Sequence, residues 1–278
     1  MFLTMEDSAK KILFVNSEMS PYLPDTDIAT LCRQLPQGIQ ERKKEIRAFM
    51  PRYGCINERK NQLHEVIRLS GMNIIISDVD RPLVIKVASI ASARIQVYFI
   101  DNEDYFKRKF VHTDERGKFF QDNDERAILF ARGTLETVKK LRWQPKIVHC
   151  IGWMSHLVPM YLKKEFKTDP IFATSSVLVT LYNEFTKEKF SPAFAKKIIA
   201  PPIKPSDVEL LNTPNGTNLA KLAVQYADGV VIGSKELPKE ISDFAAKKKI
   251  PQLVCADVSA KNTAAYTAKY LKFYSKFI

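Results

Sequence analysis

The chain is 278 residues long, with 45% hydrophobic and 27% charged residues and a formal net charge of +12. It is too apolar for a disordered chain, and no apolar run approaches the length needed to span a bilayer. The stretch from Met1 to Lys11 lacks the apolar core of a secretory signal. We therefore expect a globular, cytoplasmic protein with no membrane partner.

The positive charge is scattered along the sequence. Lysines occur in short groups such as Lys247-Lys248-Lys249, and none forms a long tract interleaved with aromatic residues. This pattern argues against nucleic-acid binding and favours a solvated, lysine-rich surface. The four cysteines and four histidines show no metal-ligand spacing. We expect no disulfide framework, no metal site and no cofactor.

The first fifty residues have the pattern of a strand–helix–strand unit. Lys11–Asn16 and Glu45–Pro51 are mostly apolar and short, as buried parallel strands are. Between them, apolar side chains recur at helical spacing, and Pro36 is expected to kink the helix. The apolar face consists of Ile28, Leu31, Cys32, Leu35 and Ile39.

The rest of the chain predicts hairpins and then alternating helices and strands. Residues 64 to 101 are β-rich with short polar breaks, which indicates hairpins or edge strands. A helix begins near Asp122, with Glu125 at capping-box spacing. Residues 185 to 216 are expected to form a proline-rich loop. Further strands are expected at 147–149, 171–174, 230–232 and 253–254, and further helices near 154–164, 218–226, 238–248 and 258–278.

This order of elements predicts one α/β domain over residues 1–278. We expect a Rossmann-like, mainly parallel sheet with helices on both faces and a β-hairpin excursion. The C-terminal helix carries an aromatic stripe at i, i+4, i+7 and i+11, formed by Tyr266, Tyr270, Phe273 and Phe277. We expect it to dock on its own domain; a protein partner or a homodimer contact through these four residues is the alternative.

Seven short segments between residues 11 and 245 occur in an order typical of one enzyme family. They are Lys11-Ile12-Leu13-Phe14-Val15 with Ser17-Glu18 and Pro21; Leu35-Pro36; Pro51-Arg52-Tyr53-Gly54; Asp122-Asn123 with Arg126; Trp143-Gln144-Pro145-Lys146-Ile147-Val148-His149; Trp153 with Leu157-Val158-Pro159-Met160-Tyr161-Leu162-Lys163; and Ala227-Asp228-Gly229-Val230 with Ser234. Together they resemble the N-terminal domain of glycogen and starch synthases, the acceptor-side half of a GT-B glycosyltransferase. The resemblance implies an ADP-glucose-dependent glucosyltransferase module, with a glucan or a nucleotide sugar as its partner.

The chain departs from this family in the loop after its first strand. The family has a K-x-G-G motif there, in which the lysine meets the nucleotide-sugar phosphate and the glycines allow close backbone approach. The corresponding positions here are Pro24, Asp25, Thr26 and Asp27. Two carboxylates would face the diphosphate and repel it.

Two further motifs also differ. The H-D-W motif becomes Ile151-Gly152-Trp153, and the I-H-N motif, with its active-site histidine, aligns with Thr174-Ser175-Ser176. A serine cannot replace an imidazole in handling protons near neutral pH. The sequence also holds no match to the second, donor-binding domain of a GT-B enzyme. We therefore expect no catalytic residues and no activity of the chain alone, so that whether it is an enzyme stays open.

Any retained ligand is expected at the carboxyl edge of the sheet, where open α/β sheets bind ligands. The candidate residues for this cleft are Ser17, Glu18, Thr26, Asp27, Trp153, Ser175 and Ser176. Glu18 and Asp27 have the residue type of an acid–base pair, but a loop residue and a helix-start residue are the simpler interpretation. Trp153 is either a stacking platform or a core residue.

Two functional interpretations remain at this point. The first is a glycogen/starch synthase-like module, a pseudoenzyme that binds glucan or regulates a true synthase. The alternative is a repurposed, non-catalytic α/β domain that binds an anionic metabolite, a nucleotide or a protein partner at the same crevice.

Overall fold

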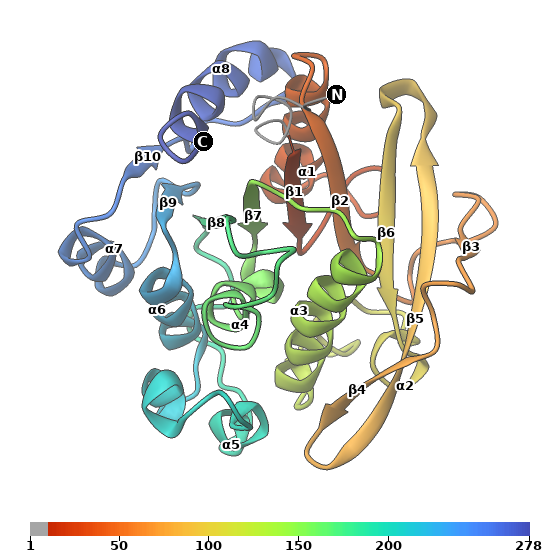
Figure 1. The fold of residues 1–278 in the computed structure, drawn as a ribbon, viewed down its shortest axis with the longest axis vertical. Coiled ribbons are helices and arrows are strands. Elements are labelled where there is room, and N and C mark those ends of the chain that lie inside the picture. Colours follow the sequence, from red (N-terminus) through yellow and green to blue (C-terminus); the bar gives the residue numbers. More distant parts are fainter. Residues whose placement is uncertain (1–10) are drawn as a thin grey trace.

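The computed structural model describes residues 11–278. Of the stretch from Met1 to Lys11, which lacks the pattern of a secretory signal, only Lys11 lies within the described residues. The described chain forms a ten-stranded sheet in the order β10-β9-β8-β7-β1-β2-β6-β5-β3, with β4 paired to β5 (Figure 1). The predicted fold class, a mainly parallel α/β sheet covered by helices, is confirmed. None of the helices within residues 11–278 is both long and apolar enough to cross a membrane.

The parallel part of the sheet is centred on β1. Its neighbours β2 and β7 both run parallel to it. Most side chains of these strands are buried, which explains why their sequences are mainly apolar. The parallel strands are β1 (Lys11–Asn16), β2 (Glu45–Pro51), β6 (Ile95–Asp101), β7 (Ile147–Ile151), β8 (Ser176–Leu181), β9 (Gly229–Ile232) and β10 (Gln252–Val254).

The predicted hairpin excursion forms one end of the sheet. The long strand β5 (Val79–Ile90) pairs antiparallel with β3 (His64–Glu65), β4 (Met72–Ile76) and β6. Because β6 also runs parallel to β2, the excursion continues the main sheet and is not a separate unit. In Figure 1 it extends to one side of β1, while β7 to β10 lie on the other.

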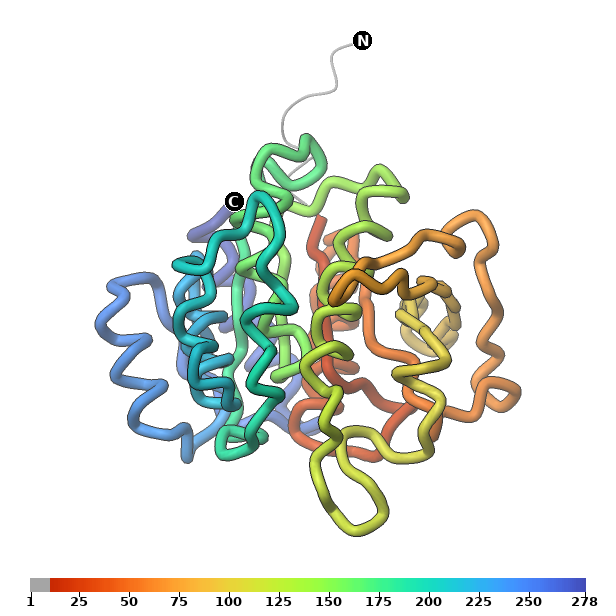
Figure 2. The backbone as a smooth tube through the Cα atoms, turned by 90° about the horizontal axis from the view of Figure 1, so that it is seen from below, coloured from red at the N-terminus to blue at the C-terminus, as the bar shows by residue number. Residues whose placement is uncertain are grey.

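Helices cover the sheet at the places expected from periodicity. The longer ones are α1 (Asp27–Gln40), α3 (Asn123–Lys140), α4 (Val158–Lys164), α6 (Gly216–Tyr226), α7 (Lys239–Lys247) and α8 (Thr263–Tyr274). Pro36 lies inside α1, which runs on past it to Gln40. Viewed from below, the loop between the short helix α2 (Glu103–Phe106) and α3 projects from the body of the domain (Figure 2).

Two local predictions need correction. Residues 171–174 form turns, closed by backbone bonds from Phe172 and Ala173 to the carbonyl of Asp169, and the strand is instead β8. The stretch 185–216 is not a bare loop, because it contains α5 (Phe194–Ile198) and the 3-10 segment η4 (Pro205–Asn212).

The C-terminal helix α8 packs on its own domain. Tyr266, Tyr270 and Phe273 of the aromatic stripe are buried, and Phe277 is half-buried. α8 lies against α1 at Gly38, where a β-carbon would stand only 2.5 Å from the Thr267 hydroxyl oxygen. The stripe is therefore covered by the chain itself, which leaves three of its four side chains out of reach of a partner.

Candidate functional site

The carboxyl ends of β1, β7 and β8 meet at one edge of the sheet. Asn16, Ile151 and Thr180 are aligned across the three parallel strands, so the residues that follow each of them emerge side by side. The Ser17 amide donates to the Ile151 carbonyl oxygen at 2.8 Å, and the Ser17 hydroxyl accepts from the Met154 amide at 2.9 Å. The predicted site residues Ser17 and Trp153 are thus brought together.

Gly152 makes this close approach sterically feasible. Its φ of 82° lies in the left-handed region that disfavours side chains. A β-carbon at this position would stand 2.5 Å from the Ser17 hydroxyl oxygen and 3.5 Å from a carboxylate oxygen of Glu184. Gly152 takes the place of the aspartate in the family's H-D-W motif. The Glu184 carboxylate lies beside the space that an aspartate side chain at position 152 would occupy.

Thr26 connects Glu18 to the start of α1. The Thr26 hydroxyl accepts from the Ala29 amide at 2.9 Å, as an N-cap does, and donates to Glu18 Oε2 at 2.7 Å. Asp27 is the first helical residue and is exposed. Asp27 lines a neighbouring cavity of about 510 Å³ together with Tyr182, Asn183 and Ser234. The helix cap is therefore Thr26 and not Asp27, and Glu18 and Asp27 do not form a pair.

Glu18 faces a different acid, Glu184, which follows β8. One ligand atom from each of Glu18, Glu184 and His112 lies within 4.8 Å of the other two. Burial, reinforced by the negative charge of Glu18, raises the pKa of the Glu184 carboxyl to about 8. Burial also raises the pKa of Glu18, although the Thr26 hydrogen bond opposes this. Glu184 accepts from the Trp153 amide at 3.2 Å.

His112 enters the cluster from the loop before α3. Its ring is packed against Tyr53, Trp153 and Phe185, with ring centroids 5.0 to 5.4 Å apart. Its backbone carbonyl accepts from the Asn123 side chain at 2.9 Å, which ties the loop to the first turn of α3. Burial, helped by the positive charge of Arg126, holds the pKa of His112 well below its usual range. The imidazole is therefore neutral.

Several buried polar groups near this edge lack partners within residues 11–278. They are the side-chain amide of Asn16, both ring nitrogens of His112, the indole nitrogen of Trp153 and the hydroxyl of Tyr182. Buried polar groups in proteins are nearly always hydrogen-bonded, so unpaired groups gathered near one edge indicate a place that interacts with something other than the chain.

Ser175 and Ser176 do not belong to this site. They precede β8 and lie at the opposite, amino edge, where Ser175 donates to the Pro145 carbonyl oxygen at 2.5 Å and Ser176 to that of Phe277 at 3.5 Å. Their placement at the carboxyl edge was wrong because it depended on the incorrect strand at 171–174. Leu181 ends the true strand, and Tyr182 and Asn183 follow it. We infer that the I-H-N motif corresponds to these three residues, with tyrosine in place of histidine.

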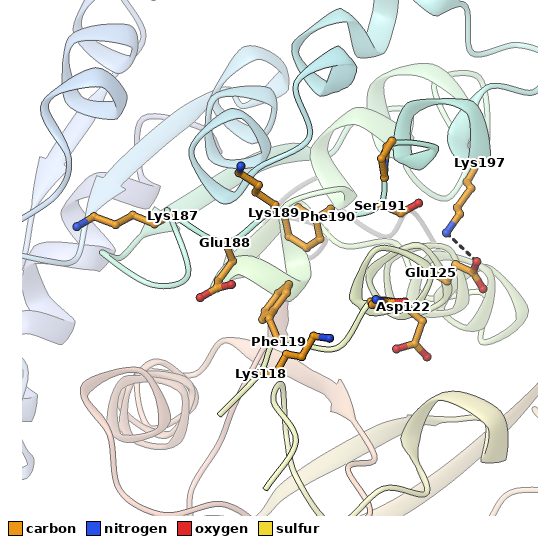
Figure 3. Close-up of a pocket in the computed structure, with 12 residues that line it drawn as sticks. Lys118, Phe119, Asp122, Glu125, Lys187, Glu188, Lys189, Phe190, Ser191 and Lys197 are labelled. Carbon is orange, nitrogen blue, oxygen red and sulfur yellow. Dashed lines mark ion pairs between the residues drawn. The ribbon is translucent and has the colours of Figure 1, made fainter. Parts of the chain in front are cut away.

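A pocket of about 800 Å³ opens beside the cluster (Figure 3). Phe119 and Phe190 form its aromatic part, with ring centroids 5.4 Å apart, and Phe119 also packs against Trp153 at 5.7 Å. Lys197 crosses to the start of α3, where it pairs with Asp124 and Glu125 at 2.7 and 2.8 Å. The polar groups on the wall are Lys118, Gln121, Asp122, Glu125, Lys187, Glu188, Lys189, Ser191 and Lys197.

The sheet order and the cleft at its carboxyl edge define an α/β domain of the GT-B glycosyltransferase type. Residues 11–254 match the model of the starch synthase catalytic domain family, and the chain belongs to that family. It is similar to the glycogen synthases of Chlorobaculum parvum, at 32% identity over 233 residues, and of Chlorobaculum tepidum, at 34% over 236 residues.

These alignments cover 84% of this chain but only 47% of each relative, so the chain spans about half the length of the curated proteins it matches. Among solved structures, it is similar to the catalytic domain of starch synthase IV from Arabidopsis thaliana, determined with bound ADP and acarbose. That match has a TM-score of 0.69 at 14% identity, and it covers 87% of this chain and 51% of the other. At this identity, the match establishes the shared fold alone.

His112, Glu184 and the pocket at Phe119 and Phe190 were not predicted from the sequence. All four residues lie in loops whose positions depend on the tertiary fold. The signal that was present in the sequence is the tyrosine-asparagine pair after the apolar run 177–181. The asparagine of this pair, Asn183, matches the last residue of I-H-N. Recognising that match would have placed the next residue, Glu184, beside the site.

Proposed function

We propose that this chain is a glucan-binding domain of the glycogen and starch synthase type that does not transfer glucose by itself. Membership of the family supports a glucan as ligand. The observation that carries the proposal is the pocket in Figure 3, because it combines exposed polar groups with an aromatic wall next to the strand ends. Sugars are recognised in this way, with ring C–H groups against an aromatic face and hydroxyls on polar side chains.

The lack of transfer is inferred from the loop between β1 and α1. The family's phosphate-binding lysine and glycines are replaced by the run from Pro24 to Asp27. Asp25 accepts a hydrogen bond from Ser20, and Asp27 is exposed at the start of α1. This loop presents carboxylates where a diphosphate would need cations.

A second candidate is an anionic metabolite in the same pocket. Lys118, Lys187 and Lys189 favour it, because none of them forms an ion pair among residues 11–278 and all three line the cavity. Binding carried by these lysines weakens as salt is raised, whereas glucan binding through Phe119 does not.

Affinity electrophoresis in gels containing glycogen tests the proposal. We expect the wild-type chain to be retarded relative to a glycogen-free gel, and Phe119→Ala to lose most of the retardation. Phe110→Ala is the matched control, because Phe110 is an exposed phenylalanine of the same loop that does not line this pocket. Unretarded migration of the wild-type chain, or equal retardation of both variants, contradicts glucan binding at Phe119.

A further inference from the structure

We propose that Glu18, His112 and Glu184 form a binding site for one divalent metal ion of the Mn²⁺ or Zn²⁺ type. Glu18 follows β1, Glu184 follows β8, and His112 comes from the loop before α3, so the site is assembled from three separate segments. The sequence predicted no metal site because these residues are far apart along the chain. The proposal is independent of whether the neighbouring pocket binds glucan.

The spacing of the three side chains suits a metal ion. One ligand atom from each residue lies within 4.8 Å of the others. Metal–ligand bonds of about 2.1 Å place neighbouring ligand atoms about 3 Å apart and opposite ones about 4.2 Å apart. Small rotations of the two glutamate side chains, with the His112 ring in place, are therefore enough to bring all three atoms into the coordination shell.

The two carboxyl groups of the site have no basic side chain as a partner within residues 11–278. In residues 11–278 neither Glu18 nor Glu184 forms an ion pair with a lysine or arginine, although the chain carries 43 basic residues. Both carboxylates are half-buried, and carboxylates removed from water are usually paired with a cation or bound to a metal. A divalent cation between the two carboxylates would remove their mutual repulsion.

His112 is the independent observation that points to a ligand. The residue is 5% exposed, and neither ring nitrogen has a hydrogen-bond partner among the described residues. The packing of Tyr53, Trp153 and Phe185 around it fixes the ring. A neutral imidazole is a metal ligand, and its presence beside two carboxylates favours Mn²⁺ or Zn²⁺ over Mg²⁺ or Ca²⁺.

Outer hydrogen bonds already orient both carboxylates. Thr26 donates to Oε2 of Glu18, and the Trp153 amide donates to Oε2 of Glu184. Each carboxylate keeps a second oxygen that accepts no hydrogen bond among the described residues. Such outer contacts are what aligns carboxylate ligands in known metal sites.

The test uses Mn²⁺ alone with the full chain after exhaustive dialysis against EDTA. Calorimetric titration is expected to show one saturable site. Glu18→Gln and Glu184→Gln keep the size of each side chain and remove its charge, and each is expected to weaken Mn²⁺ binding at least tenfold. Glu209→Gln is the matched control, because Glu209 is an exposed carboxylate outside the cluster. It is expected to bind Mn²⁺ like the wild-type chain.

A second readout does not depend on any variant folding. Pulsed electron paramagnetic resonance of the Mn²⁺ complex is expected to show modulation from a directly bound ¹⁴N nucleus, which only His112 can supply at this site. Absence of saturable Mn²⁺ binding overturns the proposal. Binding that survives both glutamine variants, or that lacks the nitrogen signal, overturns it as well.

Discussion

The hydroxyl oxygen of Tyr274 lies 2.6 Å from Nδ1 of His149, which joins the C-terminal helix α8 to the middle of β7. The other ring nitrogen of His149 lies 2.7 Å from the hydroxyl oxygen of Thr180 on β8. All three side chains are buried. A neutral imidazole has one donor and one acceptor, so it satisfies both contacts at once. The helix is thereby fixed to the sheet by a directional bond as well as by apolar packing.

Removing the Tyr274 hydroxyl is expected to destabilise the domain. Tyr274→Phe keeps the packing but leaves a ring nitrogen of His149 buried without a partner, which costs about 1–3 kcal/mol. Urea unfolding followed by circular dichroism measures the change. Tyr182→Phe is the control, because the Tyr182 hydroxyl is buried with no partner in the described chain. Equal losses in the two variants would show that the bond to His149 contributes nothing.

The buried histidines are expected to make the domain less stable in acid. Burial lowers the pKa of His149 and of His156 to about 3. Since the unfolded chain takes up these protons near pH 6.5, each histidine's contribution is complete above pH 6.5. It falls by about 1.4 kcal/mol per pH unit between pH 6.5 and 3. Glu184, with its raised pKa, has the opposite trend between its unfolded value and pH 8.

A variant separates the histidine contribution from this opposing trend. His156→Leu removes one buried imidazole whose two nitrogens have no partner in residues 11–278. The free energy of unfolding, measured in urea at pH 7 and pH 5, is expected to fall less in the variant than in the wild-type chain. The expected difference is about 2 kcal/mol. Parallel pH profiles of the two proteins would refute a neutral, buried His156.

Gly152 is expected to tolerate no side chain. Gly152→Ala forces a β-carbon to within 2.7 Å of the Ser17 β-carbon, at a φ that already costs about 1–2 kcal/mol. Gly117→Ala isolates the second effect, because Gly117 has a φ of 77° and nothing within 4 Å of its added β-carbon. We expect Gly152→Ala to lose about 1–3 kcal/mol more than Gly117→Ala in urea unfolding. Equal losses would mean that the Ser17 loop moves aside freely.

The elements that were predicted correctly are those whose signals lie within a short stretch of sequence. The central strand at Lys11–Asn16 and the helix with its Leu31–Leu35 face were predicted because apolar runs and helical spacing are visible along the sequence. The predicted strand at 171–174 was wrong because three apolar residues followed by Thr174 fit a turn as well as a strand. Hydrogen bonds to the backbone and side chain of Asp169 stabilise the turn.

The candidate site was predicted only in part for a different reason. Ser17, Glu18, Thr26 and Trp153 directly follow strands or begin a helix, so strand order alone brings them together. His112 and Glu184 reach the same point through loops. Contacts with Tyr53, Phe185 and the start of α3 position His112, and the Trp153 amide bonds to Glu184. No spacing in the sequence encodes that arrangement.

The chain is not expected to transfer glucose by itself. The loop from Pro24 to Asp27 offers a proline, two aspartates and a threonine where the family binds the donor phosphates, and the Thr26 hydroxyl is already committed to Glu18 and to the cap of α1. At the end of β8, Tyr182 stands where the family has its histidine, and a buried phenol whose pKa is raised cannot supply or accept a proton near neutral pH. We expect the 278-residue chain to incorporate no radiolabelled glucose from ADP-glucose into glycogen above a heat-inactivated control, even where the gel assay shows glycogen binding. Incorporation above that control, lost in Tyr182→Phe, would show that this edge of the sheet still performs the family's chemistry by another route.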